Sequence, residues 1–186
     1  MVFGRGDAED YELKDFDRVG RSVAALPDTH LVFIGAHEAK EMTKTHFENL
    51  SIPSNRRIVR PHKDGQDCLE QLFCEADLLL MPSRTEGFGM ISLMALSAGL
   101  PVIVSKNSGF GEALKSIPFG SMFFINSEDD SRWKMAIEDV WKKDRKLRLL
   151  EIEEVRRYYG QRYSWSQQCK WLIEKMFKLC DGMSDI

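Results

Sequence analysis

Short apolar segments alternate with amphipathic segments along this chain of 186 residues. The apolar segments have the length of β-strands, and the segments between them carry apolar residues at helical spacing. This alternation is typical of repeated βα units built around a parallel sheet. It predicts six strands, at residues 1–4, 31–35, 57–60, 77–82, 101–105 and 121–125.

The amphipathic segments predict helices at residues 16–25, 37–49, 67–75, 89–98, 112–116 and 129–142, followed by an almost continuous helical tail at residues 145–159 and 166–180. The run Leu78-Leu79-Leu80-Met81 has no polar alternation, which favours a central strand covered on both faces. The four tryptophans fall at core-like helical positions and are interpreted as packing residues: Trp133, Trp141, Trp165 and Trp171. The expected fold is therefore α/β, with a Rossmann-like parallel sheet of about six strands, flanking helices and a C-terminal helical tail.

Length and composition fit one globular domain over residues 1–186, with 43% hydrophobic and 30% charged residues. A net charge of −3 gives no reason to expect nucleic acid as a partner. No apolar run is long enough to span a membrane and no targeting segment is recognisable, so we expect a cytoplasmic protein. The first strand is short and no turn precedes it, which predicts a domain of a longer chain.

No metal site is expected, because the cysteines lack CxxC spacing and the four histidines share no ligand spacing. The basic stretch from Arg56 to Lys63 lies at a strand end, where it either contacts a nucleotide or forms a solvated edge. The solvated edge is the favoured interpretation.

The segment that carries chemistry follows the fourth predicted strand and reads Pro82-Ser83-Arg84-Thr85-Glu86-Gly87-Phe88-Gly89-Met90. Two glycines open a helix directly after a buried strand. The first N–H groups of a helix have no intrahelical partner, and glycine lets a phosphate approach them closely. Open α/β sheets also bind ligands at the carboxyl ends of their strands. The turn thus predicts an anion site, although two glycines also suit a simple tight turn.

The surrounding residues resemble glycosyltransferase family 4, whose members have the two-domain GT-B fold. The resemblance rests on Pro-Ser, a short turn, Glu-Gly-Phe-Gly, an apolar helix and then Gly99-Leu100-Pro101-Val102. Gly4-Arg5, Lys14, Ser108-Gly109 with Glu112, and Tyr163-Ser164-Trp165 resemble further family positions in the same order. This resemblance implies one half of a GT-B fold, the carboxyl-terminal domain that binds the nucleotide-sugar donor.

The resemblance also implies roles for single residues. Arg5 and Lys14 would neutralise the diphosphate, with Arg5 the stronger candidate because residues 6–13 form a longer and more acidic loop than the family pattern. Glu86 would accept hydrogen bonds from sugar hydroxyls. The remaining donor-binding positions are Gly4, Ser83, Gly87, Phe88, Gly89, Met90 and Met94. No cofactor is implied, since the substrate is a UDP-, GDP- or ADP-sugar.

One position departs from the family pattern. Family members carry a second glutamate eight residues after the first, where it hydrogen-bonds the ribose, and this chain has Met94 there. A methionine thioether is only a weak acceptor. The loss would cost about 1–3 kcal/mol of donor binding, and a glutamate at this position is expected to restore it.

Two functions remain open from the sequence. One is a retaining hexosyltransferase that needs an amino-terminal GT-B domain for its acceptor, so that this chain alone transfers no sugar. The other is a catalytically degenerate domain that senses a ligand or acts as an interaction module in a larger protein. An NAD-type dehydrogenase is disfavoured, because no GxGxxG follows the first strand.

Overall fold

The computed structural model describes residues 1–35, 40–61, 66–126 and 128–182. Within these residues, six parallel strands form two three-stranded sheets. The first sheet contains β1 (Val2–Phe3), β2 (Leu31–Gly35) and β3 (Arg57–Pro61) in that order. The second contains β4 (Leu79–Met81), β5 (Val102–Ser105) and β6 (Phe124–Ile125). The six predicted strands are therefore confirmed, although several are shorter than expected.

The two sheets meet along β1 and β4. The Leu80 N–H donates to the Met1 carbonyl at 2.9 Å, and the Met1 amino group donates to the Leu78 carbonyl at 2.7 Å. The strands thus follow the order β3-β2-β1-β4-β5-β6, which is that of a doubly wound Rossmann-type sheet. The strand order reverses between β1 and β4.

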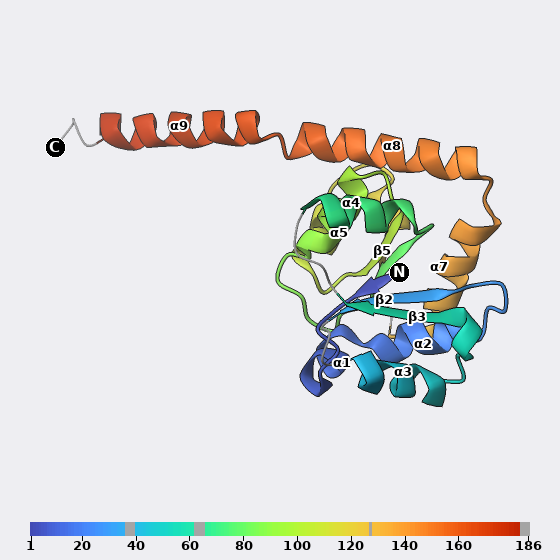
Figure 1. Cartoon of the computed structure of the whole chain (residues 1–186). Helices are drawn as coiled ribbons and strands as arrows, with labels where there is room; N and C mark the ends of the chain where they lie inside the picture. The colour runs from blue at the N-terminus through green and yellow to red at the C-terminus, as the bar shows by residue number, and fades with distance from the viewer. Residues whose placement is uncertain (36–39, 62–65, 127, 183–186) are drawn as a thin grey trace.

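Helices lie on both faces of the sheet (Figure 1). Their bounds are α1 (Ala8–Lys14), α2 (Phe16–Ala24), α3 (Lys40–Asn49), α4 (Gln66–Cys74), α5 (Met90–Ser97), α6 (Gly109–Lys115), α7 (Asp130–Lys142), α8 (Arg145–Arg162) and α9 (Trp165–Gly182), with 3-10 turns η1 (Ser54–Arg56) and η2 (Gly120–Met122). Every predicted helix is present within a few residues. The predicted helix start at His37 lies outside the described residues.

Two hydrophobic clusters pack on opposite faces of the sheet because successive strand residues point to opposite sides. Leu79 and Met81 belong to the cluster under α5, α6 and α8, whereas Leu80 belongs to the cluster under α2, α3 and α7. All three side chains are buried, which confirms that β4 is a central strand covered on both faces.

Two expectations about local structure are wrong. Residues 8–14 form α1 where the sequence suggested an acidic loop, because the Asp7 carboxylate accepts the Asp10 N–H at 2.8 Å and caps a helix. Of the four tryptophans, Trp133 is 2% exposed and packs in the core, but Trp141, Trp165 and Trp171 are exposed. Two of these three belong to α9, which extends away from the domain beyond α8 (Figure 1).

Candidate functional site

The turn between β4 and α5 is held in place by two neighbouring segments. Its Glu86 N–H donates to the Asn107 carbonyl at 3.1 Å, and the Gly87 carbonyl accepts the Gly109 N–H at 2.8 Å. The Arg84 N–H donates to the Leu13 carbonyl at 2.8 Å, which ties the turn to the end of α1. The Glu86 backbone is thus fixed between the loop after β5 and the end of α1.

Both ends of α5 depend on glycines with positive φ. Gly89 is the N-cap residue with φ 93°, a conformation that side chains with a Cβ rarely adopt. At the other end, Gly99 has φ 84°, and the Leu100 N–H reaches back to the Ala95 carbonyl at 2.9 Å. This second arrangement is a Schellman motif, and it explains physically why Gly-Leu-Pro follows the helix.

The start of α5 offers unpaired hydrogen-bond donors. Within the part of the chain that the structure describes, the backbone N–H groups of residues 87–91 donate to no other group. Unpaired N–H groups at a helix N-terminus favour an anion, through both hydrogen bonding and the helix dipole.

A cavity of about 630 Å³ opens beside this helix start. Its walls come from the residues after β1, from α1, and from the turn that follows β4, so it lies where the strand order reverses. Such a switch point is where doubly wound sheets bind their ligands. Much of its wall is apolar, from Phe3, Ile34, Met81, Phe88 and Ile91, and its polar groups are few and close to one another.

Lys14 and Glu86 form an ion pair inside this cavity. They are 72 positions apart in the chain, and α1 and the β4–α5 turn bring them together. Their side chains are only 22% and 19% exposed, so water screens this pair less than it screens a surface ion pair. The site therefore places a cation and a hydrogen-bond acceptor side by side.

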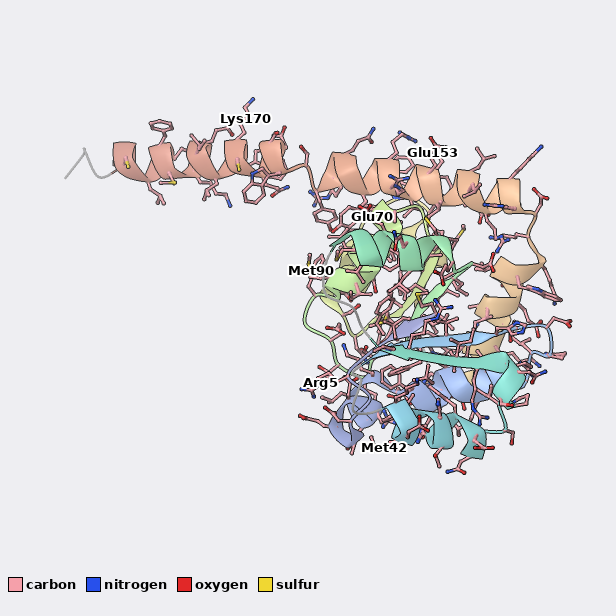
Figure 2. The ribbon with its side chains drawn as sticks, viewed as in Figure 1. Arg5, Met42, Glu70, Met90, Glu153 and Lys170 are labelled. Carbon is pink, nitrogen blue, oxygen red and sulfur yellow. The ribbon has the colours of Figure 1, made fainter. Side chains whose placement is uncertain are left out.

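Arg5 lies at the rim of the cavity and is more exposed, at 62% of its side chain. Its guanidinium group binds Asp7 at 3.1 Å and Glu9 at 3.3 Å. Figure 2 shows Arg5 at the same edge of the molecule as Met90, which begins α5. An anion at this rim would compete with the two carboxylates for the guanidinium group.

Gly4 and Asp10 complete the wall near β1. The Asp10 carboxylate is buried and accepts the Gly6 N–H at 3.2 Å. A Cβ at Gly4 would lie 2.3 Å from Asp10 Oδ2 and equally close to the Phe16 ring, so only glycine fits there. The glycine before Arg5 is thus explained by close packing against α1 and α2.

Most of the predicted site residues come together in this one cavity. Its lining includes Gly4, Arg5, Lys14, Glu86, Phe88, Gly89 and Met90. Gly87 lies in the same turn without lining the cavity, and Ser83 lines a different cavity. Met94 is partly buried and packs against the hydrophobic cluster below α5 rather than lining the cavity.

Asp10 was not predicted from the sequence. The signal that indicates it is the spacing Asp7-x-x-Asp10, a short polar residue followed three positions later by a carboxylate, as at the start of a helix. The apolar wall residues carried no signal of their own, since strand residues of this kind also fill an ordinary core.

The basic stretch after α3 has structural roles in its described part. Arg56 donates to the carbonyls of Val23 and Leu26 at the end of α2, at 2.6 and 2.5 Å. Arg57 pairs with Glu48 at 3.0 Å. Its last residues, His62 and Lys63, lie outside the described residues.

Two kinds of feature are absent from the described residues. No group of three or more histidine, cysteine, aspartate or glutamate side chains is placed to hold a metal ion. No helix there is both long enough and apolar enough to cross a lipid bilayer.

Comparison with known proteins gives one matching family model, described as "Family 4 Glycosyltransferase in conflict systems", over residues 1–172. The D-inositol 3-phosphate glycosyltransferase of Corynebacterium urealyticum is 27% identical over 127 residues, which are 68% of this chain and 28% of the relative. The lipopolysaccharide glucosyltransferase WaaG of Escherichia coli is 27% identical over 117 residues, 61% of this chain and 30% of the relative. The chain therefore spans less than a third of these relatives.

Solved structures with a similar fold include sucrose-phosphate synthase from Thermosynechococcus elongatus, with a TM-score of 0.74 and 19% identity. The alignment covers 96% of this chain and 45% of that structure. Anabaena HepE, solved in complex with UDP and glucose, has a TM-score of 0.73 and 17% identity, with 95% and 47% covered. In both cases the similarity extends over about half of the larger protein.

Proposed function

This chain belongs to family 4 of the glycosyltransferases and has the fold of the carboxyl-terminal half of a GT-B enzyme. We therefore propose that the cavity beside the start of α5, here named the donor cavity, binds a nucleotide-sugar donor. The observation that carries the proposal is the convergence of Lys14, Glu86 and unpaired helix N–H groups on one cavity at the point where the strand order reverses. Its volume of about 630 Å³ lies within the range of about 300–1,000 Å³ typical of small-molecule sites.

In this proposal the ion pair between Lys14 and Glu86 exchanges partners when the donor binds. The Glu86 carboxylate accepts hydrogen bonds from hydroxyls of the sugar, and the Lys14 ammonium turns to the diphosphate. Arg5 and the free N–H groups at the start of α5 bind the same diphosphate from the other side. The diphosphate is the leaving group in sugar transfer, so cations fixed around it stabilise the charge that develops as the glycosidic bond breaks.

Transfer requires an acceptor, which we propose is held by an amino-terminal GT-B domain opposite this cavity. The product would be a hexoside formed with retention of configuration, and the donor serves as substrate without an additional cofactor. This chain by itself is expected to bind the donor without transferring its sugar, because only one wall of the reaction cleft is present. A glycosylated product formed by the chain alone would contradict this expectation.

Thermal unfolding in the presence of UDP-, GDP- and ADP-sugars tests the donor proposal. A donor at about 100 times its Kd stabilises the folded state by about 2.7 kcal/mol, which raises the Tm of a domain of this size by about 5–10 °C. Lys14→Ala and Arg5→Ala should each weaken binding about tenfold or more, because each removes a charge-assisted hydrogen bond. Lys44→Ala, which removes a cation outside the cavity, is the control.

Arg5→Ala and Lys14→Ala are expected to weaken donor binding to different extents. The sequence favoured Arg5, whose planar guanidinium group fits a phosphate well. The geometry favours Lys14, which is less exposed and already lies next to Glu86. Calorimetry on Arg5→Ala and Lys14→Ala shows which residue contributes more to donor affinity. Unchanged affinity in both variants would mean that the diphosphate does not bind in this cavity.

The alternative proposal, a ligand-sensing or interaction module, has one observation in its favour, the methionine at position 94 in place of a ribose acceptor. It makes the same binding prediction but a different catalytic one. When a GT-B amino-terminal domain from a relative is supplied on the same chain, the enzyme proposal expects transfer and the module proposal expects none.

A further inference from the structure

A second cavity, of about 220 Å³, lies on the other side of the Ser83–Glu86 turn. It opens at the carboxyl ends of β4, β5 and β6, and its polar lining includes Ser83, Arg84, Lys106, Asn107 and Arg18. Its volume is below the range of about 300–1,000 Å³ for drug-sized ligands, so it suits a small ion or the end group of a larger molecule.

This cavity contains a buried hydroxyl group that lacks a hydrogen-bond partner among the described residues. Ser83 is 1% exposed, and among the described residues its hydroxyl has no hydrogen-bond partner. The Arg18 side chain is 8% exposed, and its Nη1 forms an ion pair with Asp130 at 3.7 Å but no hydrogen bond within the described part of the chain. Buried polar groups in native proteins are almost always hydrogen-bonded, so an unpaired hydroxyl at a cavity wall points to a bound water or ligand.

The charges favour an anion. Three cations line the cavity, Arg18, Arg84 and Lys106, against two carboxylates, Asp15 and Glu128. The Asp15 carboxylate is already paired with Arg18 at 2.7 Å and with Arg84 at 3.5 Å, and Arg18 also lies 3.7 Å from Asp130, outside the cavity lining. Glu128 is exposed. Lys106, by contrast, is exposed at the cavity wall and forms no ion pair within residues 1–35, 40–61, 66–126 and 128–182. The Lys106 ammonium group and the unpaired Ser83 hydroxyl therefore line the same cavity, and neither has a protein partner among the described residues.

We propose that this second cavity binds a phosphoryl group. The Ser83 hydroxyl and the Asn107 side-chain amide would donate to its oxygens, and Lys106 with Arg84 would balance its charge. Free phosphate and a phosphomonoester present the same group, so the geometry is compatible with either source. The proposal is independent of the donor site, because the two cavities have no lining residue in common.

Titration calorimetry on the whole chain with inorganic phosphate, and separately with glycerol 3-phosphate, tests this proposal against sodium chloride at equal ionic strength. Lys106→Ala should weaken phosphate binding about tenfold or more, as expected for loss of a charge-assisted hydrogen bond. Ser83→Ala should weaken it several-fold. Lys115→Ala removes an exposed cation that does not line the cavity and should leave the affinity unchanged.

Phosphate bound in the donor cavity is separated from this signal by repeating the titrations in an Arg5→Ala background, which weakens phosphate binding there. Binding that persists in this background and is lost when Lys106→Ala is added belongs to the second cavity. Tighter binding of glycerol 3-phosphate than of phosphate would identify a phosphomonoester as the ligand, and the reverse order would identify the free ion. No heat above that of chloride, equal losses in Lys106→Ala and Lys115→Ala, or no further loss when Lys106→Ala is added to Arg5→Ala would each overturn the proposal.

Discussion

Tyr11 on α1 illustrates how burial changes the chemistry of a single side chain. Its ring packs edge-on against the Phe16 ring, with 5.3 Å between the ring centroids. Its hydroxyl has no hydrogen-bond partner among the described residues. Burial raises the pKa of the Tyr11 phenol to about 12, the nearby Thr43 hydroxyl partly opposes this shift, and the carboxylates of Asp17 and Asp10 add to it. The folded state therefore keeps a proton that the unfolded chain loses near pH 10.

From this shift we predict that stability falls as the pH rises from about 10 to about 12 and is unaffected by this group below pH 10. The loss is at most about 2–3 kcal/mol, and less because the ring is partly exposed. Tyr11→Phe should remove this alkaline loss at little cost near neutral pH. Urea unfolding at pH 9 and pH 11.5 measures both effects, and an alkaline loss as large in Tyr11→Phe as in the unmodified chain would contradict the assignment.

Met94 is a second position where a single side chain affects both the stability of the domain and its affinity for a donor. It belongs to α5, is partly buried against the cluster that this helix covers, and follows one helical turn after Met90, which does line the cavity. For Met94→Glu we predict a moderate loss of stability, about 1–3 kcal/mol, because a carboxylate replaces an apolar contact. We also predict up to about a tenfold gain in affinity for a donor that contains ribose.

The matched control is Leu93→Glu, at a neighbouring α5 position that is also partly buried against the same cluster. It should lose stability without any gain in affinity. Measuring Tm and donor Kd for both variants separates the two effects. Equal affinities for Met94→Glu and Leu93→Glu would mean that position 94 does not reach the ribose.

At the scale of single elements, α5 depends on the backbone of its first residue. Gly89 has φ 93°, whereas a Cβ there would meet its nearest heavy atoms only at 3.6 Å, so the conformation rather than the space requires glycine. We predict that Gly89→Ala costs about 1–3 kcal/mol of stability and also weakens donor binding, because it distorts the start of the helix.

Gly87 provides the control for this prediction. It lies in the same turn without a positive φ, and a Cβ there would meet nothing within 4 Å. Gly87→Ala should therefore leave the urea midpoint nearly unchanged. If both variants unfold at the same urea concentration, strain at Gly89 does not limit the stability of α5.

The elements also show which parts of the site were predictable from the sequence. The turn between β4 and α5 could be predicted, because a buried apolar run followed by two glycines is compatible with few other local structures. Helix α1 was not predicted, because its acidic residues are also typical of a loop unless Asp7 is recognised as the N-cap. The ion pair between Lys14 and Glu86 was also missed, since contacts across 72 residues depend on how α1 packs against the turn rather than on any local pattern.

At the scale of the whole molecule, the sheet and its two covering layers followed from periodicity, but the exposure of the tail did not. The same apolar spacing describes a helix packed in a core and a helix that leaves its apolar residues exposed. Trp133 and Trp165 both lie at such positions, yet they are 2% and 81% exposed. Only the three-dimensional arrangement separates the two cases, because α7 packs against α2 while α9 leaves the domain (Figure 1).

Helix α9 carries a large exposed apolar surface, with Trp165 81%, Leu172 59%, Met176 57%, Phe177 65% and Leu179 70% exposed. Among residues 165–180 of this helix, none belongs to either hydrophobic cluster. A contiguous apolar surface of this kind favours association, either with another protein or between copies of the chain. The helix should therefore add little to the stability of the domain and much to its tendency to associate.

We predict that a chain ending at Ser164 unfolds within about 3 °C of the full chain, since about 1 kcal/mol corresponds to about 2–4 °C for a domain of this size. The shortened chain should also associate less as concentration rises, which sedimentation velocity measures. In the full chain, Leu172→Lys with Phe177→Lys should reduce association similarly, whereas Ser166→Lys with Gln167→Lys adds the same charge at polar positions and should reduce it less. A fall in Tm of 10 °C or more on truncation, far beyond about 1 kcal/mol, would show instead that α9 packs against the domain.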